Sequence, residues 1–148
     1  GQGMGWIKQR YIRRIKSRIY DYVVANYPKL ENDRFVLGDM PYNYKCHYNA
    51  VQKVLEGKAD KVYACIAIHK RDWRDIIVHF INGTQKGKCQ DNTWGWVYKY
   101  YDYYLVKEVK EDEYDNVVDI LGGLKEMLIQ LNSNAMLRKL LRIDSSII

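Results

Sequence analysis

Our expectation for the fold starts from the stretch Lys45-Cys46-His47-Tyr48-Asn49-Ala50. In this stretch a predicted loop ends and a predicted helix begins, and Cys46 lies at the boundary. Residues 29–44 are rich in turn-forming residues and predict a loop, whereas apolar residues recur at helical spacing over residues 46–56. A thiol in the first turn of a helix lies near unpaired backbone N–H groups and the positive end of the helix dipole, and both favour the thiolate. Cys46 is therefore our candidate nucleophile.

Two later stretches supply the partners that a nucleophilic thiol needs. Residues 76–82 are predicted to form a strand, in which His79 stands between apolar neighbours. A glycine-containing turn over residues 83–87 and a strand over residues 88–92 would complete a hairpin that brings Asp91 beside His79. The imidazole would then take the proton of the thiol and Asp91 would orient the ring, which makes Cys46, His79 and Asp91 a candidate catalytic triad.

Each of these residues also has a structural interpretation, and these alternatives stay open at the level of the sequence. A cysteine is commonly a small buried hydrophobic residue, and we interpret Cys65 and Cys89 in that way. His79 could be a hydrogen-bonded histidine of the core, and Asp91 could simply cap a turn.

The rest of the chain predicts an α+β fold in which helices pack against an antiparallel sheet. Helices are predicted over residues 6–27, 46–56, 114–131 and 135–143, and strands over residues 61–69, 76–82, 88–92 and 103–109. Residues 71–75 are expected to form a charged connection. We expect a single domain over residues 4–148, with a C-terminal helical segment over residues 112–143 and a remnant of an expression tag over residues 1–3.

Composition limits the function classes. With 148 residues, 47% hydrophobic and 28% charged, the chain should fold around one core. Three cysteines without metal-ligand spacing predict free thiols in a reducing cytoplasm, with no metal or cofactor. No apolar run is long enough to span a membrane, and no membrane partner is expected. Abundant Lys, Asn, Ile and Tyr are typical of an AT-rich genome such as that of a bacteriophage, and the location would then be the host cytoplasm.

The first predicted helix carries a basic face that includes Arg10, Arg13 and Arg14. This face fits nucleic acid or an acidic protein partner, although an ordinary solvated face has the same composition. We do not favour the nucleic-acid interpretation.

Taken together, Cys46-x-x-Asn49-Ala50, the strand with His79 and Asp91-x-Thr93-Trp94 resemble small papain-like and transglutaminase-like cysteine hydrolases of phage and bacterial genomes. The resemblance covers about residues 44–106. It implies a papain-like arrangement with the cysteine helix packed on an antiparallel sheet. It also implies acyl transfer at an amide of a protein or peptide, as in a peptidase, amidase, deamidase or transglutaminase-like enzyme.

The supporting residues in this interpretation are Asn49, Thr93 and Trp94. The chain departs from the papain pattern because no clear glutamine precedes Cys46 and the Gly-Ser-Cys-Trp motif is absent. Asn43 or the backbone N–H of Cys46 would then have to stabilise the oxyanion. The competing interpretation is a non-enzymatic phage protein that uses this fold to bind a host protein.

Overall fold

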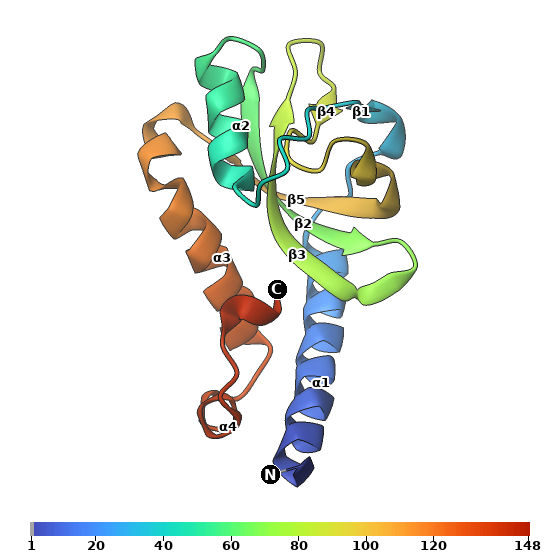
Figure 1. Ribbon diagram of the computed structural model, residues 1–148, viewed down its shortest axis with the longest axis vertical. Coiled ribbons are helices and arrows are strands. Elements are labelled where there is room, and N and C mark those ends of the chain that lie inside the picture. The colour runs from blue at the N-terminus through green and yellow to red at the C-terminus, as the bar shows by residue number, and fades with distance from the viewer. Residues whose placement is uncertain (1) are drawn as a thin grey trace.

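A computed structural model describes residues 2–148 and shows an α+β fold, with one five-stranded sheet and helices around it (Figure 1). Of the expected tag remnant, Gly1 lies outside the described residues. The helices are α1 (Gln2–Asn26), α2 (Cys46–Leu55), α3 (Val117–Leu131) and α4 (Ala135–Leu141). The strands are β1 (Phe35–Val36), β2 (Lys61–His69), β3 (Asp72–Gly83), β4 (Cys89–Gln90) and β5 (Tyr101–Val109). Short 3-10 helices are η1 (Asn32–Arg34), η2 (Gly95–Tyr100), η3 (Glu111–Asn116) and η4 (Ser145–Ile147).

The sheet has the order β1-β4-β3-β2-β5 and is mixed. Strands β2 and β3 form a long antiparallel hairpin, and β5 pairs antiparallel with the other edge of β2. The prediction of an antiparallel sheet is wrong at one edge, because β1 pairs with β4 in parallel. The segment between β1 and β4 contains α2, β2 and β3, and a connection of that length permits parallel pairing.

One edge of β3, the edge that pairs with β4, is mostly free of a neighbouring strand. Strand β4 pairs with β3 only at Asn82 and Gly83, so most of this edge of β3 has no neighbouring strand. The N–H of Val78 donates instead to the carbonyl oxygen of Ile148, at 3.4 Å. Alternate residues of a strand direct their backbone groups to the same edge, so Phe80 also directs its N–H there. Helix α2 begins at this gap (Figure 1).

The two faces of the sheet have different covers. Helices α1 and α3 pack on one face through buried residues that include Ile15, Ile19, Leu128 and Ile129, and α2 packs beside them on Phe80. The opposite face is covered by the loops around η1 and η2, and its core consists of Leu30, Phe35, Cys65, Ala67, Ile81, Cys89 and Tyr103. Because side chains alternate along a strand, His79 lies on this second face although Phe80 lies on the first.

Most predicted elements are present with shifted ends. Strand β2 covers residues 61–69 as expected, but β3 begins at Asp72, so residues 72–75 are strand and not a connection. Tertiary contacts stabilise this extension: Trp73 packs edge-on against Tyr20, and Asp75 accepts a hydrogen bond from Tyr101. The helix predicted from residue 114 begins with η3, and the strand predicted over residues 88–92 is limited to Cys89–Gln90. No helix among residues 2–148 is long and apolar enough to cross a bilayer.

Candidate active site

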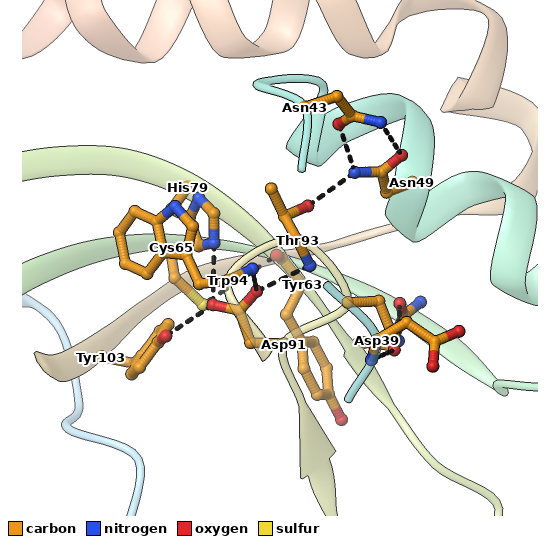
Figure 2. A network of polar contacts seen from close by, with 12 residues as sticks. Asp39, Asn43, Asn49, Tyr63, Cys65, His79, Asp91, Thr93, Trp94 and Tyr103 are labelled. Carbon is orange, nitrogen blue, oxygen red and sulfur yellow. Dashed lines mark hydrogen bonds and ion pairs between the residues drawn. The ribbon is translucent and has the colours of Figure 1, made fainter. Parts of the chain in front are cut away.

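A buried hydrogen bond joins His79 to Asp91. The Nε2 atom of His79 lies 2.9 Å from Oδ2 of Asp91, and the two side chains are 2% and 0% exposed (Figure 2). His79 comes from β3, and Asp91 comes from the turn that follows β4 and not, as predicted, from within that strand. A polar pair this deeply buried keeps its geometry, because water cannot compete for its hydrogen bond.

The carboxylate of Asp91 is held by four donors. Besides His79, Oδ2 accepts a hydrogen bond from the hydroxyl of Tyr103 at 2.6 Å, and Oδ1 accepts from the backbone N–H groups of Thr93 and Trp94 at 3.0 and 2.8 Å (Figure 2). Burial raises the pKa of Asp91, but the His79 charge and these hydrogen bonds outweigh burial and lower the pKa below its usual value. Asp91 therefore remains an anion that faces His79.

The indole of Trp94 fixes the plane of the imidazole. The two rings are stacked, with centroids 3.7 Å apart and an angle of 16° between the planes. The ring of Tyr103 lies beside this stack, with its centroid 6.3 Å from that of His79 and 6.3 Å from that of Trp94. Stacking on an aromatic face also favours the protonated form of the imidazole, because the face of an aromatic ring attracts cations.

Cys46 is the first residue of α2 and is 8% exposed. Because Asp91 occupies Nε2 of His79, the nitrogen that remains for the thiol is Nδ1. Burial raises the pKa of the Cys46 thiol, but the hydrogen bond with His79, the His79 charge and the backbone N–H of Phe80 outweigh burial and lower the pKa. The Phe80 N–H reaches the sulfur because β4 does not extend that far along β3.

The His79 imidazole shifts in the complementary direction. Burial lowers its pKa, but the charge and hydrogen bond of Asp91, together with Cys46, outweigh burial and raise the pKa to about 10. A lowered thiol pKa beside a raised imidazole pKa favours transfer of the thiol proton to the imidazole, which would give a thiolate–imidazolium pair. The structure thus brings together the three residues of the predicted triad.

The thiol pKa of the other two cysteines shifts in the opposite direction from that of Cys46. Cys65 and Cys89 are fully buried, and burial raises the pKa of both thiols. Neither lies at a helix N-terminus, because Cys65 is in β2 and Cys89 is in β4. They are therefore poor nucleophiles in the folded protein.

The proposed supporting asparagines hold the loop before Cys46. The Nδ2 group of Asn49 donates to Oδ1 of Asn43 at 2.8 Å and to the hydroxyl of Thr93 at 2.9 Å (Figure 2). The N–H of Lys45 donates to the same oxygen of Asn43, at 3.0 Å. Asn49 therefore ties α2 to the turn that carries Asp91, and the Asn43 amide is engaged in the loop. The Cys46 N–H, which has no acceptor within the helix, remains the other candidate for the oxyanion.

Sequence reasoning missed a second layer of residues behind the site. Asn82 is fully buried, and its Nδ2 donates to the carbonyl oxygens of Ala50 and Lys61 at 2.8 and 3.0 Å. Its Oδ1 accepts from Nδ2 of Asn92 at 2.9 Å. Asn82 therefore links α2, β2 and the Asp91 turn. For Asn82, the available signal in the sequence was a polar residue at the end of an otherwise apolar strand. For Tyr103, one tyrosine among many, the sequence offered no signal.

The arginines of the basic face lie elsewhere. Arg10, Arg13 and Arg14 are exposed on the half of α1 that extends away from the sheet (Figure 1). Arg10 lies over the ring of Trp6, with its guanidinium carbon 5.5 Å from the ring centroid. The three arginines do not contact the thiol site. Among residues 2–148, no three His, Cys, Asp or Glu side chains gather in an arrangement that could hold a metal ion.

Comparisons with known proteins give no independent identification. No family model, curated protein or solved structure matches the chain. The geometry of Cys46, His79 and Asp91 is therefore the basis on which a function can be assigned.

Proposed function

We propose that this protein is a thiol-dependent acyl-transfer enzyme that acts on an amide, with Cys46 as nucleophile, His79 as proton carrier and Asp91 as the residue that orients His79. The observation that supports the proposal is the arrangement of three buried side chains: Cys46 begins α2, it is hydrogen-bonded to His79, and His79 is bonded to Asp91 at 2.9 Å. This arrangement lowers the pKa of the Cys46 thiol. Burial alone would raise that pKa, so a specific local arrangement opposes it. Perturbed pairs of this kind occur preferentially at catalytic sites.

The first half of the reaction would follow from the placement of the three side chains. The Cys46 thiolate attacks the carbonyl carbon of the amide, and the carbonyl π electrons move to oxygen. The Nδ1–H of imidazolium His79 then gives its proton to the departing amine nitrogen as the C–N bond breaks, which leaves a thioester on Cys46. Asp91 stabilises the charged ring and keeps Nε2 protonated, so that Nδ1 faces the sulfur.

The second half would regenerate the site. A water molecule or an amine gives its proton to Nδ1 of His79 and attacks the thioester, and the thiolate departs. Water gives hydrolysis and an amine gives transfer. The backbone N–H of Cys46, at the N-terminus of α2, would stabilise the oxyanion in both steps. The substrate class that we propose is a protein or peptide amide, as the resemblance to cysteine hydrolases implies.

The proposal is tested by trapping the thioester. Wild-type protein is incubated with a peptide library that carries C-terminal amides and glutamine side chains, and intact-mass spectrometry monitors acyl adducts on Cys46. We expect an adduct that hydroxylamine removes and that Cys46→Ala lacks. Cys65→Ala and Cys89→Ala are matched controls that should retain the adduct. The absence of an adduct in wild type, together with an unreactive thiol, would contradict the proposal.

A second candidate is a binding protein without turnover, acting on a host protein. The 8% exposure of Cys46 favours it, because a substrate carbonyl must reach the sulfur. The variant Cys46→Ser separates the two candidates. A binding protein would keep its affinity for the host protein, whereas an enzyme would lose its turnover.

A further inference from the structure

The positive charge of the chain is concentrated at one end of the molecule. We define the basic tip as residues 4–18 of α1 together with residues 134–142, which include α4. The tip contains nine cations and no carboxylate: Lys8, Arg10, Arg13, Arg14, Lys16, Arg18, Arg138, Lys139 and Arg142. Since the whole chain has 24 cations and 18 carboxylates, the remainder has 15 cations and 18 carboxylates, a net charge of −3. The net charge of +6 is therefore a property of this tip.

None of the nine cations of the tip forms an ion pair within residues 2–148. Apolar side chains lie exposed among them. Trp6 is 65% exposed and Leu140 is 68% exposed, and Met4, Ile7, Met136 and Leu137 are also exposed. One hollow between the helices is lined by Tyr11, Arg14, Arg18, Ser133, Asn134 and Leu137. Cations around exposed apolar groups are typical of a surface that binds an acidic and partly apolar partner.

The molecule carries a second surface with the complementary character. We define the acidic groove as the hollow between α2 and the segment 111–119. Its walls include the exposed apolar side chains of Tyr48, Leu55 and Val118. The segment 111–119 holds five carboxylates and no cation, namely Glu111, Asp112, Glu113, Asp115 and Asp119. Only Glu113 among these five forms an ion pair in the described part of the chain, with Lys107.

Unsatisfied polar atoms mark the same two surfaces. Across residues 2–148, two buried side-chain nitrogens lack a hydrogen-bond partner, and they are Nδ1 of His47 and Nε of Arg138. His47 lines the acidic groove, and Arg138 belongs to the basic tip. Buried polar atoms without partners are costly, and a molecule packed on either surface would offer acceptors or donors after a small side-chain rotation.

We propose that the basic tip of one copy of this chain docks into the acidic groove of a second copy. The two surfaces lie toward opposite ends of the long axis of the molecule, with the N-terminus and α4 at one end and α2 nearer the other (Figure 1). Such a head-to-tail contact leaves a free tip and a free groove on each dimer, so further copies add until a ring closes. Nucleic acid would pair with the cations and stack its bases on Trp6, but it would leave Met136, Leu140 and the acidic groove uncovered.

The test is sedimentation velocity of the full chain from about 1 to about 300 μM at low salt, a range that covers weak association. We expect the mean mass to rise past that of a dimer of the 17.6 kDa chain. High salt should weaken association at least about fivefold, because it screens charge pairs. The tip variant Arg14→Glu/Arg18→Glu and the groove variant Asp115→Lys/Asp119→Lys should each stay monomeric.

Mixing the two variants is the sharper experiment. The tip variant retains a native groove and the groove variant retains a native tip, so an equimolar mixture regains this contact and should form a dimer. Larger species would mean that the charge-swapped tip and groove, which are also complementary, pair as well. The control Lys70→Glu/Arg71→Glu changes the net charge by the same amount at a distant hairpin turn and should assemble like wild type. Circular dichroism of all variants separates loss of folding from loss of contact.

Three results would overturn the proposal: a wild-type monomer at every concentration, a tip variant that assembles like wild type, or a mixture that remains monomeric. A wild-type monomer that shifts a single-stranded RNA at low salt would assign the tip to nucleic acid instead. Because the variants alter no residue of the thiol site, Cys46 alkylation in each should stay within about twofold of wild type.

Discussion

Replacing Asp91 by Asn should change which nitrogen of His79 carries the proton. Oδ1 of Asp91 accepts from two backbone N–H groups, so an amide at this position must keep its oxygen there. Its NH₂ group then takes the place of Oδ2 and points at Nε2 of His79. Because an N–H cannot face another N–H, the imidazole must carry its proton on Nδ1 and become neutral. The substitution preserves the shape of the site and removes the charge that raises the pKa of His79.

The size of the effect follows from the pKa values. An imidazole with a pKa of about 10 is almost fully protonated at about pH 7. Without Asp91, burial lowers the His79 pKa, and the Cys46 thiol loses its cationic partner. A thiol with the ordinary pKa of 9.0 is about 1% thiolate at about pH 7. We therefore expect alkylation of Cys46 to slow by up to about 100-fold, and any acyl-transfer rate to fall by about 10²–10⁴-fold.

The assay is iodoacetamide labelling at about pH 7 with peptide mass spectrometry of Cys46. The matched control is Tyr103→Phe, which removes a different hydrogen bond to the same oxygen and leaves Asp91 charged. This control should label within about threefold of wild type. An Asp91→Asn protein that is folded and labels as fast as wild type would show that the Asp91 charge does not activate Cys46 through His79.

Three further substitutions test how the site is held. Asn82→Ala should lower the free energy of unfolding by about 2–4 kcal/mol in urea titrations, because it removes the three hydrogen bonds that link β3 to α2, to β2 and to the turn that carries Asp91. Gly38→Ala should cost about 1–3 kcal/mol, since a Cβ there would lie 2.1 Å from the carbonyl oxygen of Asp91. Gly122→Ala, where a Cβ meets nothing within 4 Å inside α3, should instead raise stability by about 0.5–1 kcal/mol. A destabilising Gly122→Ala, or a neutral Gly38→Ala, would contradict the packing described here.

The sequence predicted the parts of the fold that depend on local pattern. The alternation in residues 61–69 and the helical spacing after Cys46 gave elements with nearly correct bounds. The predicted hairpin of β3 and β4 is present, but its register ends at Asn82 and Gln90, and Asp91 reaches His79 from the turn that follows β4. Asn49, a predicted supporting residue, joins α2 to the turn that carries Asp91 through its hydrogen bond to Thr93.

The parts that the sequence did not predict depend on long-range contacts. The two-residue strand β1 has too little pattern to detect, and its parallel pairing with β4 is set by tertiary packing. The stacking of Trp94 on His79 and the Tyr103 hydrogen bond to Asp91 join residues at least 12 positions apart. Neither contact leaves a periodic signal. The low exposure of Cys46 likewise follows from the packing of α2 at the edge of β3, which no local pattern encodes.

The pH dependence of Cys46 alkylation, in wild type and in His79→Ala, tests the central claim most directly. A thiol with a pKa of 9.0 loses about 200-fold in thiolate content between about pH 8.5 and about pH 6. The lowered pKa of Cys46 and the raised pKa of His79 predict a clearly shallower fall in wild type over this range. His79→Ala should restore the steep dependence of an ordinary thiol. A steep wild-type profile that His79→Ala leaves unchanged would contradict the thiolate–imidazolium pair and, with it, the proposed chemistry.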